Sequence, residues 1–207
     1  MMTCTGRLLT GSLLLAALAL AGCVTPLQAP PAPQRFDLAV ALPAATDAAR
    51  TAGIGSVRVS VPRALPGYRD AAFAYRYDPY ELRYYATSRW LAEPAEMVHA
   101  ALVAALEATG PFARVLPLAG GGRPDYRLDS ELVYLVQDFS ATPSRSRLGL
   151  RLWLIETGSG VVLGSRLIEA EAPAATEDAR GGAEAASHAL AQVLGEVAVA
   201  LRRWLRP

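Results

Sequence analysis

Alternation of apolar and polar residues dominates the chain after residue 35, and period-two spacing is typical of half-buried β-strands. The clearest example lies between residues 145 and 157. There Leu148, Leu150, Leu152 and Leu154 form one face, and Arg147, Gly149, Arg151 and Trp153 form the other. The same reading predicts strands at 36–42, 54–62, 70–77, 81–86, 112–118, 125–139, 145–157 and 160–173.

Two segments show helical spacing instead. In residues 94–110 the apolar side chains recur every three or four positions, with Pro94 in the first turn and Gly110-Pro111 at the end. The second segment ends near Trp204 or Leu205. Since glycine inside a helix costs about 1 kcal/mol relative to alanine, Gly181-Gly182 predict that this helix begins near Ala183.

The order of these elements predicts an α+β fold in a single domain, with a largely antiparallel sheet and two helices packed on one face. No internal repeat interrupts this pattern.

The N-terminal segment differs from the rest, because Arg7 is its only charge before residue 35. Residues 8–22 form an apolar run with small residues at its end, as in a secretory signal. The last four residues, Leu20-Ala21-Gly22-Cys23, resemble the lipobox of bacterial lipoproteins. The resemblance implies a signal peptide at 1–22 and acylation of Cys23. The alternative is an ordinary signal peptide with an incidental cysteine.

Residues 23–34 would then comprise the lipidated cysteine and a proline-rich tether, and residues 35–207 would form the domain. Several acyl chains on one residue hold a protein stably at a membrane. Inner-membrane lipoproteins of Gram-negative bacteria often carry aspartate after the lipidated cysteine, whereas here Val24 stands there. The resemblance therefore implies an outer-membrane location, with the domain in the periplasm.

Composition removes several classes of function. Of the two cysteines, Cys4 lies in the predicted signal peptide and Cys23 at its end, so the mature chain would hold no disulfide. All basic residues are arginine. Without Arg7 the chain has 19 of them against 19 acidic residues, so no nucleic-acid partner is expected.

Catalytic and metal-binding motifs are equally sparse. The two histidines, His99 and His188, lie on separate predicted helices without zinc-ligand spacing. No G-x-S-x-G elbow marks a hydrolase nucleophile. The carboxylates of Asp78 and Glu81 flank a predicted turn, which explains them more simply than acid–base chemistry. We therefore expect no enzyme activity, no metal site and no cofactor.

Five of the eight tyrosines fall in one short segment, YRYDPYELRYYATSRW, residues 75–90. Its alternation predicts two strands around a turn in which Asp78 bonds the backbone ahead and Pro79 presets φ. Tyrosine, tryptophan and arginine are enriched at interface hot spots. The candidate partner-binding surface is therefore Tyr75, Tyr77, Asp78, Tyr80, Arg83, Arg89 and Trp90. The alternative places Tyr77, Leu82 and Tyr84 in the core.

This segment also carries a family resemblance. Together with Val61-Pro62-Arg63, Tyr75 to Leu82 and Arg89-Trp90 resemble the ABC-type transport auxiliary lipoproteins, which are PqiC-like. Glu93 stands before Pro94, where the family pattern leads us to expect aspartate.

The resemblance implies an anchored accessory subunit of an MCE-type ABC system that moves lipids or other hydrophobic molecules between membranes. Its partners would be an MCE-domain protein with its permease and ATPase, the membrane, a possible lipid cargo and a possible second copy. The alternatives are a free-standing lipid carrier and an outer-membrane assembly or envelope lipoprotein without a transporter.

Overall fold

The computed structural model describes residues 32–42 and 53–206. The predicted signal peptide, Cys23 and most of the tether lie outside the described residues. The elements are β1 (Gln34–Phe36), β2 (Ser56–Val59), β3 (Arg63–Ala64), β4 (Ala72–Arg76), β5 (Arg83–Trp90), α3 (Pro94–Thr109), β6 (Arg114–Leu116), β7 (Tyr126–Asp138), β8 (Arg145–Glu156), β9 (Val162–Pro173) and α4 (Ala179–Trp204).

Three long antiparallel strands form the main part of the sheet. The strand β7 pairs with β8 along its whole length, and β8 pairs with β9. The shorter strands β2, β3 and β4 run parallel to β7, while β6 pairs with β2. The strand β5 is antiparallel to β4 and at its far end pairs in parallel with β1.

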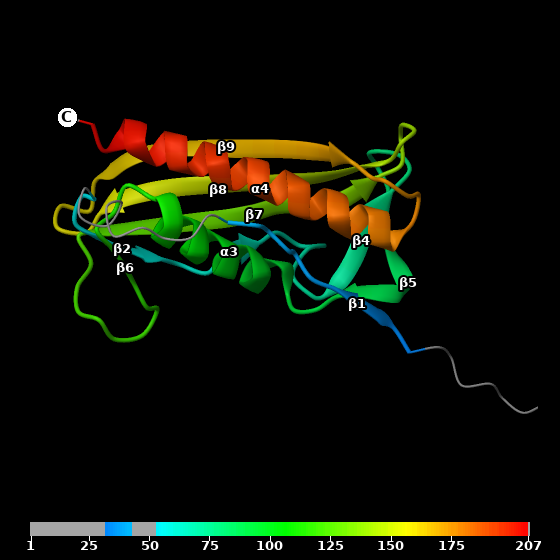
Figure 1. Cartoon of the computed structure of the whole chain (residues 1–207), viewed down its shortest axis with the longest axis horizontal. Coiled ribbons are helices and arrows are strands. Elements are labelled where there is room, and N and C mark those ends of the chain that lie inside the picture. Colours follow the sequence, from blue (N-terminus) through cyan, green and yellow to red (C-terminus); the bar gives the residue numbers. More distant parts are fainter. Residues whose placement is uncertain (1–31, 43–52, 207) are drawn as a thin grey trace, which may run out of the picture. The chain divides into compact units, whose positions relative to one another are not determined.

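Both helices cover the same face of this sheet, with α4 across the long strands and α3 beside it (Figure 1). The alternating leucines of β8 point into the core under α4, where they are fully buried: Leu148, Leu150, Leu152 and Leu154. On α4 the buried stripe includes Leu190, Val193, Leu194, Val197 and Leu201. The predicted α+β fold, with two helices on one face, is confirmed.

The start of α4 differs from the prediction. The helix begins at Ala179, not near Ala183, and Asp178 caps it by accepting a hydrogen bond from the backbone N–H of Gly181 (2.9 Å). Gly181 and Gly182 are buried against neighbouring groups that a Cβ would strike. Close packing therefore outweighs the poor helix propensity of the two glycines.

The first strand is also displaced from its predicted range. It spans Gln34–Phe36, and Asp37–Leu42 is not a strand. Side chains satisfy the backbone there instead, because Leu38 N–H donates to its neighbour Asp37 (2.8 Å) and Ala39 N–H donates to Ser187 Oγ on α4 (3.1 Å). Such local bonds compete with strand pairing.

Candidate functional site

The tyrosine-rich segment forms a hairpin of β4 and β5 at one end of the sheet. At its tip the carboxylate of Asp78 accepts hydrogen bonds from the backbone N–H groups of Tyr80 (2.8 Å) and Glu81 (3.2 Å). The predicted role of Asp78 in the turn is confirmed. Both bonds hold the carboxylate in the turn.

Three tyrosines stand out from this hairpin into solvent. Tyr80 is 97% exposed, Tyr77 55% and Tyr84 45%. The alternative that placed Tyr77 and Tyr84 in the core is therefore wrong, and Leu82 is only half-buried. The hairpin tip, defined as residues 77–84, presents phenol rings that do not contribute to the core.

Trp90 does not belong to this surface. It is only 1% exposed and stacks on Phe73, with ring centroids 4.1 Å apart. The strand β5 continues to residue 90, so Trp90 turns inward while Arg89 turns outward. Tyr75 is half-buried against Tyr85, with a centroid separation of 4.7 Å. Trp90 and Tyr75 therefore support the hairpin from its buried side.

The arginines at the hairpin are differently placed. Arg83 donates to Glu81 (2.6 Å), and its guanidinium lies 5.7 Å from the ring centroid of Tyr77. Arg89 is exposed and lies beside Arg35 of β1 in the strand register. Neither Arg35 nor Arg89 forms an ion pair with another described residue. No local pattern in the sequence indicates this pairing, because the two residues are far apart in the chain.

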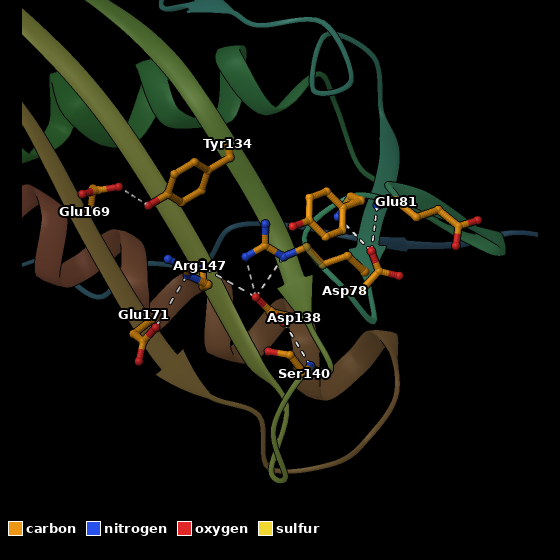
Figure 2. A network of polar contacts seen from close by, with 10 residues as sticks. Asp78, Glu81, Tyr134, Asp138, Ser140, Arg147, Glu169 and Glu171 are labelled. Carbon is orange, nitrogen blue, oxygen red and sulfur yellow. Dashed lines mark hydrogen bonds and ion pairs between the residues drawn. The ribbon is translucent and has the colours of Figure 1, made fainter.

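A charged network joins the hairpin to the long strands. Asp138 at the end of β7 accepts from Arg76 of β4 through Nε (2.9 Å) and an Nη atom (2.6 Å), and Arg147 of β8 lies 3.5 Å away. Figure 2 shows Arg147 between Asp138 and Glu171, with the hairpin turn alongside. Burial raises the pKa of Asp138, but hydrogen bonds from Ser140 and Arg76 outweigh it and lower that pKa to about 2.

The network belongs to the sheet face that the helices leave uncovered. Next to it Tyr134 donates a hydrogen bond to Glu169 (2.6 Å), and burial together with this carboxylate raises the pKa of Tyr134 to about 12 (Figure 2). Arginines and carboxylates are thus paired along this face. Cross-strand pairs of opposite charge such as these help to fix the register of the strands.

A shallow hollow of about 340 Å³ lies toward the other end of the same face, beside Trp153, Ile155 and Val162. The outward direction of Trp153 and Arg147 follows the alternation seen in the sequence. The hollow itself is lined by β3 and the residues just before it, together with β7, β8 and β9, so its existence could not be read from any one strand.

Metal and membrane-spanning features can be stated for the described residues only. Over 32–42 and 53–206 no group of three or more metal-ligating side chains comes together. His99 lies 3.2 Å from the carbonyl of Val59, while His188 is exposed on α4. In this same part of the chain, neither helix combines the length and hydrophobicity needed to cross a membrane.

Comparisons with known proteins agree with the family resemblance noted in the sequence. The sequence model for the ABC-type transport auxiliary lipoprotein component matches residues 36–198. No curated protein matches the chain. A crystal structure from Xanthomonas campestris, assigned to family DUF330, shares 22% identity over 81% of this chain and 93% of its own, with a TM-score of 0.68.

A second crystal structure, of an uncharacterized protein, is 11% identical and has a TM-score of 0.65. It covers 81% of this chain and 97% of its own length. At such identities these two structures support the fold alone. The family match rests on the sequence model and on the nearly full extent of the domain that it covers.

Proposed function

Because the chain belongs to the ABC-type transport auxiliary lipoprotein family, we propose that it is the anchored accessory subunit of an MCE-type system moving lipids or other hydrophobic molecules. In this proposal Cys23 is acylated, the anchor lies in the outer membrane, and the domain faces the periplasm. The match over residues 36–198 is the observation that carries the proposal.

The domain acts in this proposal by binding and not by catalysis. Two carboxylates are occupied in structural roles, because backbone N–H groups of the turn hold Asp78 and Arg76 holds Asp138. The exposed members of the predicted partner surface remain available: Tyr77, Tyr80, Arg83 and Arg89. These four side chains are free to contact one of the proposed partners, a transporter subunit or the membrane.

Co-purification tests the transporter partner. A tagged, lipidated chain extracted in mild detergent is expected to bring down the MCE-domain protein with its permease and ATPase. In the matched control the N-terminal 23 residues are replaced by a signal peptide that is cleaved without lipidation. That control should lose membrane fractionation and the transport phenotype while its domain stays folded. Recovery of the lipidated chain without any transporter subunit would contradict the proposal.

The second candidate is an envelope-assembly or structural lipoprotein without a transporter. Crosslinking in intact cells separates the two, because this candidate predicts adducts with an outer-membrane barrel protein and none with an MCE-domain protein. Lipid mass spectrometry of the detergent-free soluble domain tests for a carrier, which would retain bound lipid.

A further inference from the structure

The β4–β5 hairpin and the strand through which the chain enters the domain, β1, lie at the same end of the molecule. The strand β1 runs parallel to β5, with Gln34 beside Ser88 and Phe36 beside Trp90. Going back from Gln34 therefore corresponds to going back along β5 toward Arg83 and the tip. Figure 1 shows β1 and the β4–β5 hairpin at one end and the C-terminus at the other.

The length of the preceding segment bounds how far this end can lie from a membrane. Residues 23–33 can reach at most about 40 Å even when fully extended. If Cys23 is acylated, which is part of the proposed function on which this inference rests, Gln34 stays within that distance of the lipid surface. The end of the domain that carries β1 and the hairpin is then held within that distance of the bilayer.

The chemistry of the tip suits the headgroup region of a bilayer. Tyr80 presents its whole ring and hydroxyl, an apolar body with a polar end that favours membrane–water interfaces. Tyr77 and Tyr84 are about half exposed beside it, with Tyr77 packed on Phe139 and the hydroxyl of Tyr84 donating to the carbonyl of Gly67 (3.2 Å). The carboxylate of Asp78 is held by backbone N–H groups, and Glu81 is neutralised by Arg83. The tip therefore presents aromatic surface with little uncompensated negative charge.

Arg35 and Arg89 place two cations at the base of the same hairpin, where Arg89 lies opposite Ala72 at the start of β4. Two like charges that lie side by side in a strand register repel each other, and an anion between them relieves that repulsion. Guanidinium groups bind phosphate oxygens in a bidentate fashion. Leu91, the next residue but one after Arg89, is exposed and donates its N–H to the carbonyl of Phe36 (2.7 Å).

We propose that the hairpin tip and the Arg35–Arg89 pair contact the headgroups of the membrane that holds the lipid anchor. The acyl chains supply most of the membrane affinity, since each buried methylene contributes about 0.8 kcal/mol. The tyrosines and arginines fix which end of the domain faces the lipid. The open sheet face and the helices are then presented away from the bilayer, at a set orientation.

Quenching by brominated lipid tests this contact in the lipidated full-length mature chain. Tyr80→Cys places a single free thiol at the tip, because Cys23 is consumed by acylation in the proposed function. The thiol carries an environment-sensitive fluorophore, and the protein is reconstituted in vesicles of phosphatidylethanolamine and brominated phosphatidylglycerol. The matched control is Gly158→Cys in the turn after β8, where no described atom lies within 4 Å of an added Cβ.

We expect several-fold stronger quenching at position 80 than at position 158. The double change Arg35→Gln and Arg89→Gln should reduce the response of the position 80 label to phosphatidylglycerol. Equal quenching at the two positions, with the protein still in the vesicle fraction, would overturn the membrane contact. If the emission spectrum of the label at position 80 changes only after a transporter subunit is added, the membrane contact is overturned in favour of a protein partner.

These outcomes separate the inference from the function on which it rests. Equal quenching combined with intact co-purification of the transporter leaves the accessory-lipoprotein role standing and removes only the membrane contact. Failure of the lipidated chain to bind any transporter subunit contradicts the proposed function, whatever the label at position 80 reports.

Discussion

The side-chain amide of Gln137 occupies the space that a side chain at residue 182 would need. A Cβ on Gly182 would meet the Oε1 and Cδ atoms of Gln137, which is fully buried in β7. That amide accepts from the hydroxyl of Tyr85 (3.0 Å) and donates to Ser144 Oγ (3.0 Å) and the carbonyl of Asp178 (3.2 Å). One polar side chain thereby joins the hairpin, the sheet and the start of α4.

Gly182→Ala is expected to destabilise the protein by about 1–3 kcal/mol. The added methyl displaces Gln137, and a buried polar group that loses its partners costs that much. Gly195→Ala is the matched control in the same helix, since nothing described lies within 4 Å of a Cβ there. It should stabilise by about 0.5–1 kcal/mol. Urea denaturation followed by circular dichroism measures both, and equal effects would contradict the packing explanation.

Asp138→Asn is expected to lower stability at neutral pH by about 1–3 kcal/mol, because Arg76 loses a charged partner. The folded-state pKa of Asp138, about 2, lies below the ordinary value of 3.8. The ionised Asp138 carboxylate therefore contributes its full stabilisation of the folded state above pH 3.8, and this stabilisation is lost as the pH falls toward 2.

The difference in the free energy of unfolding between wild type and Asp138→Asn should accordingly become smaller as the pH falls from 3.8 toward 2. Urea titrations at pH 7 and at successive values below 4 measure it. A double cycle with Arg76→Gln isolates the part that depends on the ion pair. A difference that stays constant down to pH 2 would show that the carboxylate charge has no role.

Trp90→Ala is expected to cost about 3–5 kcal/mol, because it removes a large buried ring that stacks on Phe73. Its neighbour Arg89 is exposed, and Arg89→Ala should change stability by no more than about 0.5 kcal/mol. Differential scanning calorimetry compares the two variants. Similar melting temperatures would mean that Trp90 is not part of the core.

Arg58→Met should loosen the glycine-rich loop between β6 and β7 without unfolding the domain. The guanidinium of Arg58 donates to the carbonyls of Pro117 (3.1 Å), Gly120 (2.7 Å) and Gly122 (2.7 Å). Without these bonds the loop has few contacts to hold it. Hydrogen exchange should become faster in residues 118–122 and stay unchanged in β8, and uniform acceleration would indicate global destabilisation instead.

Local pattern was sufficient for much of this fold. The alternation along β8 correctly predicted which side chains point into the core and which point outward, because every second side chain of a long antiparallel strand is buried. The turn at Asp78 was predicted for the same reason, since its hydrogen bonds reach only two or three residues along the chain. The order of strands and helices was enough to predict helices on one face.

The features that were predicted wrongly or missed depend on contacts between residues far apart in the sequence. The early start of α4 depends on Gln137, which lies 45 positions before Gly182. Trp90 was assigned to the surface because aromatic residues beside arginine resemble an interface, whereas Phe73 determines its burial. The pairing of Arg35 with Arg89 depends on a parallel register that no local spacing reveals.

The pairing of β1 with β5 gives the domain a mechanical property. A pull on the chain from the N-terminal side acts along β1, so its hydrogen bonds to β5 are loaded together in shear and must break in concert. Just beyond β1, Leu38 is buried and Ala39 N–H is bonded to Ser187 of α4. Force applied to the chain before β1 is therefore spread into the core of the domain before the first strand can peel away.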